Sequence, residues 1–256
     1  MKMLILILIS LQAIAIDSLA ISENAQKLGA SREAISQALC FHQKHIGKTK
    51  FYKKIRGKLT SSTIITNDNF LVVQDFTQTA LDQRFYLINL KTNEVQSYYS
   101  AHGSGNFPQH FNWPTIAEYF SNTPNSNLTP QGFMISGERL ESKRGWKWTM
   151  KFDGVEVGLN DNSRDREIVF HPGVGSTDWN DERIDQGYIS SNDMINTSKQ
   201  SLEIRYMSKG CTMVSKHNAE DIYNKTKKGT LFYNFTEELK DKGDLYCGSE
   251  NYLTIK

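Results

Sequence analysis

Short runs of β-branched and aromatic residues recur between positions 69 and 235, and glycines or polar clusters bound each run. This composition is typical of β-strands. The runs lie at residues 70–76, 84–90, 90–101, 132–137, 146–154, 166–171 and 229–235. Strands this short and this closely spaced predict a mainly β sandwich or barrel with minor helices.

Helical spacing replaces this pattern at two places. Residues 22–47 carry apolar positions at helical intervals, with Ser31 available as N-cap and Gly47 as the stop. A shorter helical stretch is predicted at 215–229. Between the first helix and the first strand, residues 48–62 read as a basic, turn-rich connector whose charges form a solvated face, with contact to an anionic surface as the alternative.

The first residues have the layout of a secretory signal. Lys2 is followed by the apolar run at 3–16, and small residues permit cleavage after Ala15 or Ala20. The run is short for a membrane span, so an uncleaved anchor is the lesser alternative. We therefore expect a signal peptide at 1–20, an N-terminal helical segment with its connector at 21–60, and one domain at 61–256 that has no membrane span after cleavage.

Composition adds one exclusion. The net charge is +2, with no basic block, so nothing indicates a nucleic-acid partner. Residues 172–204 are polar and irregular, and a connection of that length predicts a lid or binding element.

Three cysteines leave the disulfide arithmetic open. Pairing Cys40 with Cys247 would leave Cys211 as a thiol, whereas the alternative is that no disulfide forms.

Cys211 and His171 are the strongest candidates for chemistry. "REIVFHP" delivers His171 at the end of an apolar strand, and "SKGC" places Cys211 beside Gly210. A thiolate is the nucleophilic form of cysteine, and a histidine can carry its proton to a leaving amine. Amides near Gly210, Cys211 and Thr212 could point at one oxyanion. The alternative is that both side chains are structural.

The "SKGC" element, with a histidine before it at the end of an apolar strand, resembles the catalytic motif of the L,D-transpeptidase (YkuD-type) family. The stretches at 71–105, 118–138 and 154–173 follow in the order of one branch of that family, the branch with a non-histidine residue before the Gly-Cys. The resemblance covers roughly residues 69 to 236.

The resemblance implies an L,D-transpeptidase-like catalytic domain at 61–256 that is exported to a bacterial periplasm or cell envelope. Cys211 matches the acyl-accepting nucleophile and His171 its base, while Ser208 and Gly210 match the flanking motif positions. The family cleaves the bond between the third and fourth residues of peptidoglycan stem peptides, and passes the acyl group to an amine or to water. No metal or organic cofactor is implied.

The sequence departs from the usual motif at three points. Lys209 occupies the position of the commoner histidine, Thr212 follows the cysteine, and 39 residues separate His171 from Cys211 (172 through 210). Lys209 could favour a thiolate electrostatically or simply be exposed.

Further polar residues are candidates for contact with substrate. His102 in "AHGSG" could line the cleft or only bond a strand-end loop. Arg166 and its neighbour Arg164 could bind a carboxylate, although salt bridges with Asp161 or Asp165 are the favoured alternative. We group His102, Arg166 and Lys209 as substrate-binding candidates.

Two other functional classes compete with transpeptidation. The first is a hydrolase of the same fold, either an L,D-carboxypeptidase or a cross-link endopeptidase, and the second is a non-catalytic peptidoglycan-binding module. A zinc site is disfavoured: His171 and Asp178 have a suitable spacing, but no paired histidine motif accompanies them, and His217 and His110 would be ligands only by assumption.

Overall fold

The computed structural model describes residues 16–106, 116–142, 147–173 and 207–243. Most of the irregular segment 172–204, together with His110, Asp178 and Cys247, lies outside these residues.

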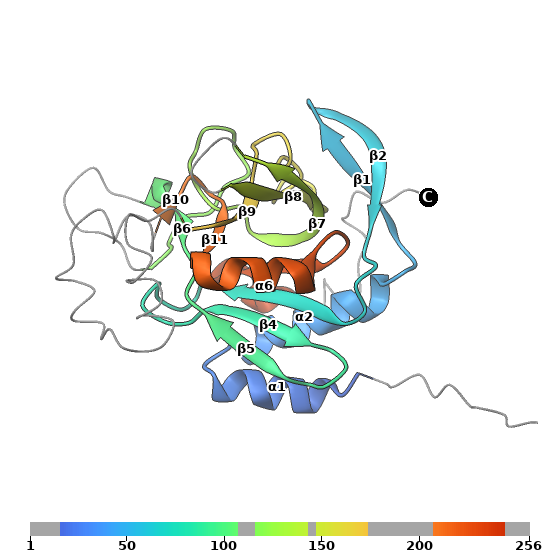
Figure 1. The fold of residues 1–256 in the computed structure, drawn as a ribbon, viewed down its shortest axis with the longest axis vertical. Coiled ribbons are helices and arrows are strands. Elements are labelled where there is room, and N and C mark those ends of the chain that lie inside the picture. The colour runs from blue at the N-terminus through green and yellow to red at the C-terminus, as the bar shows by residue number, and fades with distance from the viewer. Residues whose placement is uncertain (1–15, 107–115, 143–146, 174–206, 244–256) are drawn as a thin grey trace, which may run out of the picture.

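An eight-stranded sheet forms the centre of the protein (Figure 1). Its spatial order is β11 (Thr212–Val214), β9 (Val169–Pro172), β8 (Trp148–Gly154), β7 (Gly132–Glu141), β12 (Leu231–Phe235), β3 (Phe70–Asp75), β4 (Phe85–Asn89) and β5 (Val95–Tyr98). Neighbours are antiparallel except for the pairs β11–β9 and β12–β3, which are parallel. Two small sheets pair β1 (Lys50–Ile55) with β2 (Lys58–Ile64), and β6 (His102–Gly103) with β10 (Met207–Ser208).

The two ends of the large sheet approach each other. Ser100, just after β5, forms an isolated antiparallel bridge with Val214 of β11. The sheet therefore curls into a nearly closed barrel, and the predicted mainly β fold is confirmed. We call the junction formed by residues 100–103 and 207–214 the seam.

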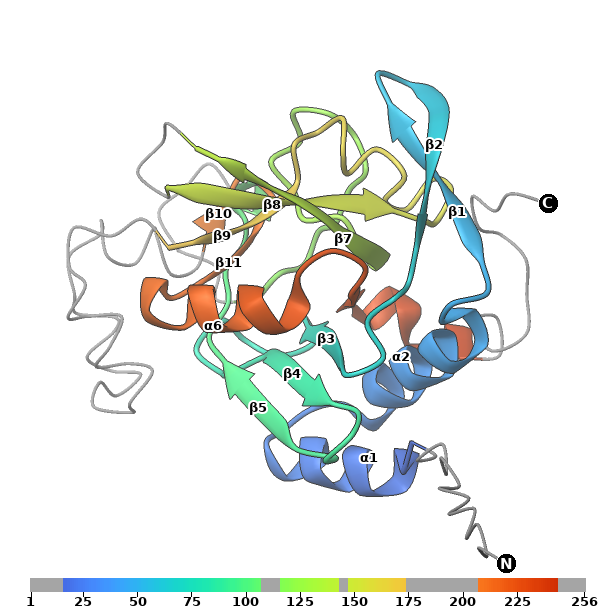
Figure 2. The same ribbon diagram turned by 45° about the vertical axis from the view of Figure 1, so that its right-hand side comes forward.

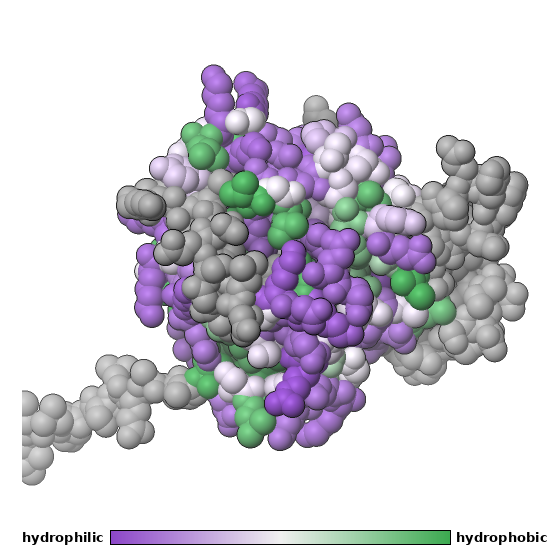
Figure 3. All heavy atoms as spheres, turned by 180° about the vertical axis from the view of Figure 1, so that it is seen from behind, coloured by the Kyte–Doolittle hydropathy of each residue, from purple (hydrophilic) through white to green (hydrophobic). Residues whose placement is uncertain are grey.

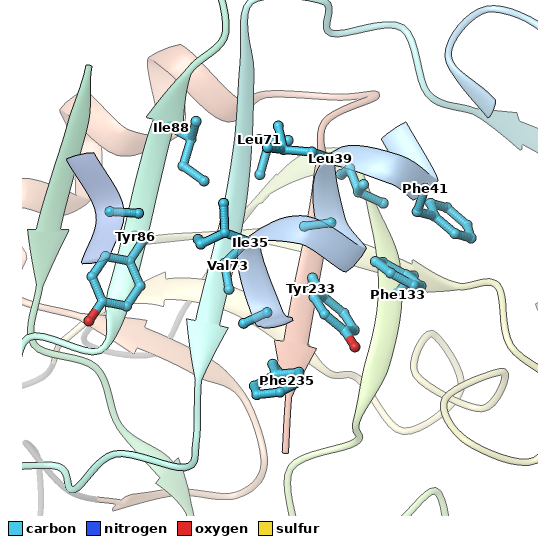
Figure 4. Close-up of a cluster of buried hydrophobic side chains, with 14 of the residues drawn as sticks. Ile35, Leu39, Phe41, Leu71, Val73, Tyr86, Ile88, Phe133, Tyr233 and Phe235 are labelled. Carbon is cyan, nitrogen blue, oxygen red and sulfur yellow. The ribbon is translucent and has the colours of Figure 1, made fainter. Parts of the chain in front are cut away.

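The strands alternate between two hydrophobic clusters, as the period-2 pattern requires. On β3, Leu71 and Val73 enter one cluster, while Val72 enters the other. The first cluster packs against α1 (Ser18–Lys27) and α2 (Arg32–His45), with Phe133 stacked at 4.0 Å on Tyr233 (Figure 4). The second packs against α6 (Lys216–Thr226), which lies between strands β7–β9 and strands β3–β5 (Figure 2).

The predicted helix over 22–47 is two helices. α1 ends at Lys27, and Gly29 then adopts a left-handed φ of +96°, a conformation that glycine reaches without strain. Ser31 caps α2 by accepting a hydrogen bond from the Ala34 amide, as predicted. The apolar spacing had concealed the break.

The predicted connector over 48–62 is wrong, because most of it forms the hairpin β1–β2. Arg56 and Gly57 make the turn, both with positive φ, which is the geometry of a two-residue hairpin loop. Its lysines are not simply solvated. Lys53 pairs with Asp153 at 3.3 Å and Lys54 pairs with Asp161 at 2.8 Å, so two ion pairs hold the hairpin against the barrel.

Two short 3-10 helices, η1 (Ser104–Asn106) and η2 (Glu237–Lys242), complete the described elements. The face in Figure 3 is mainly hydrophilic, with apolar residues scattered across it. None of the helices within the described ranges is long and apolar enough to cross a membrane. Cys40 is disulfide-bonded and Cys211 carries a thiol, while the predicted partner, Cys247, lies outside the described residues.

Candidate active site

The loop that carries Cys211 is held at the seam by one opposing segment. Before the loop, Met207 and Ser208 pair in parallel with His102 and Gly103. After it, the Ala101 amide donates to the Met213 carbonyl at 3.0 Å. Residues 100–103 therefore hydrogen-bond to the chain on both sides of the Cys211 loop.

Ser208 holds the inside of this loop. Its hydroxyl donates to the Cys211 carbonyl at 2.7 Å and accepts from the Gly210 amide at 3.0 Å. The second bond occupies an amide that the sequence offered as an oxyanion donor. The amides of Cys211 and Thr212 are therefore the candidate oxyanion donors that remain.

Gly210 is required by both conformation and space. Its φ of +99° is left-handed, and a Cβ there would lie 2.5 Å from the Leu128 carbonyl oxygen. Gly103, across the seam, leaves equally little room, since its Cβ would lie 2.3 Å from the Asn127 carbonyl oxygen. The two glycines let residues 127–129 pass directly behind the Cys211 loop.

His171 stands on β9 beside this loop and is buried. In the parallel register Met213 pairs with His171, whereas Thr212 pairs with Phe170 of the second core cluster. Cys211 directly precedes β11, two residues before Met213, and the alternation of side chains along an extended chain would turn it to the face of Met213 and His171.

The tautomer of His171 follows from its hydrogen bond. Its Nδ1 lies 2.7 Å from the Pro172 carbonyl oxygen. A carbonyl can only accept, so Nδ1 carries the hydrogen and Nε2 is the nitrogen able to take up a proton.

Cys211 is 8% exposed, and its Sγ lies 3.7 Å from the Glu167 carbonyl oxygen, within hydrogen-bond range for sulfur. Glu167 has a φ of +56°, which is unusual for a residue with a Cβ. This backbone conformation turns the Glu167 carbonyl toward the thiol.

His102 is fully buried and bonds to Arg84 rather than facing solvent. Arg84 Nη2 lies 2.8 Å from His102 Nδ1 and 3.1 Å from the Ser100 carbonyl oxygen, so it holds two residues of the segment 100–103 in place. Burial, and then the Arg84 charge, lower the pKa of His102 to about 3. His102 therefore stays neutral, with its hydrogen on Nε2.

Arg164 and Arg166 have partners that the sequence did not predict. Arg164 pairs with Asp153 and Glu138, not with Asp161 or Asp165. Arg166 donates to the carbonyls of Ser121 and Leu128, the latter at 2.6 Å, and to Ser126 Oγ at 3.2 Å. Its guanidinium thus hydrogen-bonds the protein's own backbone and one hydroxyl, and a role in substrate binding stays a prediction.

The remaining candidates lie around the same loop. Lys209 is exposed beside Cys211, and Thr212 Oγ1 accepts from the buried Gln74 amide at 2.9 Å. Of the suggested zinc ligands, Asp178 and His110 lie outside the described residues. Within the parts of the chain that are described, no cluster of three metal-binding side chains occurs.

Sequence reasoning missed Arg84, Leu128 and Gln74. Arg84 directly precedes β4, where a polar residue normally marks a boundary, and Leu128 acts through its carbonyl, which no side-chain pattern reveals. Only the "AHGSG" motif pointed to this side of the site.

Comparison with known proteins gives one family match and several similar solved structures. No curated protein matches the chain. Similar solved structures include Bd1075 of Bdellovibrio bacteriovorus, at 12% identity over 76% of this chain and 57% of that one, with a TM-score of 0.37. An L,D-transpeptidase from Mycobacterium smegmatis matches at 13% identity over 71% of this chain and 64% of that one, with a TM-score of 0.33.

An L,D-transpeptidase from Xylanimonas cellulosilytica matches at 12% identity over 85% of this chain and 92% of that one, with a TM-score of 0.33. The chain spans less than two thirds of the length of the first two of these proteins. The model of the L,D-transpeptidase catalytic domain matches residues 42–235, more than half of the chain. The chain therefore belongs to the L,D-transpeptidase catalytic-domain family.

Proposed function

We propose that this protein is a cysteine acyltransferase that acts on peptidoglycan stem peptides. The observation that carries the proposal is the tautomer of His171. With Nδ1–H donated to the Pro172 carbonyl, the basic Nε2 belongs to a side chain whose register partner, Met213, lies two residues from Cys211. A nucleophile with a base nearby is the minimum for acyl transfer through a thioester.

The reaction proceeds in two balanced steps. Cys211 Sγ attacks the carbonyl of the third stem residue, and its proton passes to His171 Nε2. The C–N bond to the fourth residue breaks, that residue's amine takes the proton from His171, and a thioester remains on Cys211. An acceptor amine then loses its proton to His171 and attacks the thioester, which restores the thiol.

The surroundings support this chemistry in two ways. Ser208 and Gly210 hold the loop in one conformation, so the thiol is positioned before substrate arrives. The amides of Cys211 and Thr212 are the nearest remaining candidates for donors to the oxyanion.

We further propose export to the bacterial cell envelope. Of the two cleavage points suggested by the sequence, the one after Ala15 would leave α1 whole, because the helix begins at Ser18 with Asp17 as its N-cap. Cleavage after Ala20 would remove the cap. N-terminal sequencing of protein secreted by the host would decide between them.

The test of the function is mass spectrometry of muropeptides. Purified protein is incubated with disaccharide-tetrapeptides, beside Cys211→Ala as the control. Cross-linked dimers, or exchange of the fourth residue, made only by the native protein are the expected result. Loss of that residue without dimers would indicate a carboxypeptidase. Equal activity of a correctly folded Cys211→Ala variant would overturn the mechanism.

A further inference from the structure

Arg166 lies directly behind the Cys211 loop. Its Nη2 donates to the Leu128 carbonyl at 2.6 Å, and this same oxygen lies 2.5 Å from the position of a Cβ on Gly210. The next residue, Glu167, places its carbonyl 3.7 Å from Cys211 Sγ. Arg166 is thus joined to the nucleophile through the backbone on two sides.

The charge of Arg166 has no counter-ion among the described residues. Its acceptors are two carbonyls and one hydroxyl, all neutral, and no carboxylate forms an ion pair with it. A half-buried cation with only neutral partners is unfavourable unless an anion lies near. Burial lowers the pKa of Arg166, and the charge of Cys211 acts in the opposite direction. Because the interaction is mutual, the same charge pair favours the thiolate.

Other groups around Cys211 act in known directions. His171 lies on the neighbouring strand β9, in register with Met213. Lys209, in the same loop as Cys211, is exposed, so solvent screens its charge. The Glu167 carbonyl accepts from the thiol and therefore favours its neutral form. Across the seam, His102 is neutral, and the cation of Arg84 is turned to His102 and to the Ser100 carbonyl.

We infer that Arg166 is a positioning residue for Cys211: its guanidinium holds the Leu128 carbonyl against Gly210 and favours the thiolate. The inference deepens the proposed function, since it assigns the source of thiol activation at the same site. It concerns the resting enzyme and can be tested without peptidoglycan.

The experiment is the pH profile of alkylation of Cys211 by iodoacetamide in the full chain, read on the Cys211 peptide by mass spectrometry. Arg166→Gln removes the cation and keeps a hydrogen-bond donor. We expect its alkylation rate at pH 7 to fall about tenfold, with recovery about one pH unit higher. Lys209→Gln, which removes the exposed cation, is the matched control and is expected to stay within about twofold of the native rate.

Equal profiles for Arg166→Gln and the native protein, or an equal loss in both variants, would overturn the inference. Circular dichroism checks folding. If Arg166→Gln does not fold, the native protein still decides. Raising KCl from about 0.1 M to about 1 M should move the midpoint of the alkylation profile little if the half-buried Arg166 cation sets it. A midpoint that rises with salt would point to Lys209 instead and contradict the inference.

The outcome is separable from that of the muropeptide assay. A shifted profile in a protein that modifies no muropeptide would keep the Arg166 assignment and reject the proposed reaction. An unshifted profile in an active protein would do the reverse.

Discussion

Arg164 and Arg166 are two residues apart in one loop, yet their guanidinium groups enter opposite environments. Arg164 points to β7 and β8, where it pairs with Asp153 and Glu138. Arg166 points to residues 121–128, behind the Cys211 loop, where its partners are neutral oxygens.

The direction of each pKa shift records this difference. Burial acts to lower the pKa of Arg164, but hydrogen bonds to Glu138 and Asp153 raise it above its ordinary value. Burial lowers the pKa of Arg166, and only Cys211 opposes that change. Within the described residues, Arg164 has two carboxylate partners, whereas Arg166 has only neutral hydrogen-bond acceptors. The difference indicates that an arginine charge can act on a neighbouring group such as Cys211 only where no carboxylate already pairs with it.

The largest expected effect separates the two arginines by stability. Arg164→Met leaves Asp153, whose side chain is 1% exposed, with Lys53 as its remaining ion-pair partner at 3.3 Å. Breaking a buried pair costs about 3 kcal/mol of the free energy of unfolding, measured by urea denaturation. Arg166→Gln, which loses bonds to neutral acceptors, is expected to cost about 1 to 2 kcal/mol. If Arg166→Gln were the more destabilising change, the division of roles would fail.

The next effect is at the loop itself. Gly210→Ala places a Cβ against the Leu128 carbonyl at 2.5 Å, so the loop must shift and Cys211 with it. Displacement of a catalytic group costs about 100-fold in rate, which the muropeptide assay would measure. The control is Gly158→Ala, whose φ of +81° is also left-handed but whose Cβ would meet nothing within 4 Å. That variant should lose only about 1 kcal/mol of stability and keep its activity.

The smallest effect is the pH dependence of the Arg164 pair. The Arg164 hydrogen bond lowers the pKa of Glu138 to about 2 from the model-compound value of 4.5. A carboxyl with a lowered pKa in the folded state contributes stability above pH 4.5, and loses it as the pH falls toward 2. Because the Glu138 side chain is 44% exposed, Glu138→Gln should cost less than about 1 kcal/mol at pH 6. The difference between variant and native protein should shrink in acid, and a difference that grew there would contradict the assigned pair.

Much of the barrel could be predicted because its strands follow a local rule. Leu71, Val72 and Val73 alternate between two cores, and this alternation is visible in the sequence. The breaks were harder to see. Gly29 sits inside a continuous apolar spacing, and the basic hairpin is stabilised by Asp153 and Asp161, about 100 positions away along the chain.

The candidate site could be predicted where chemistry has a sequence signature, but not where it depends on how distant segments approach each other. Cys211 and His171 stood out because thiol and imidazole are reactive and follow a recognisable motif. The predicted partners of Arg164 and Arg166 were wrong. Nearness in sequence suggested Asp161 and Asp165, but the loop directs both guanidinium groups to other strands and turns. A backbone oxygen such as that of Leu128 leaves no trace in a side-chain pattern.

The central claim is that Cys211 carries the acyl group, and peptide mass spectrometry of protein quenched during turnover tests it most directly. Native protein is mixed with a tetrapeptide donor, quenched at short times in acid and digested, with Cys211→Ala in parallel. The account predicts an adduct on the Cys211 peptide that equals the donor without its fourth residue, and none in the variant. Turnover without any adduct on Cys211, or the same adduct in the variant, would contradict it.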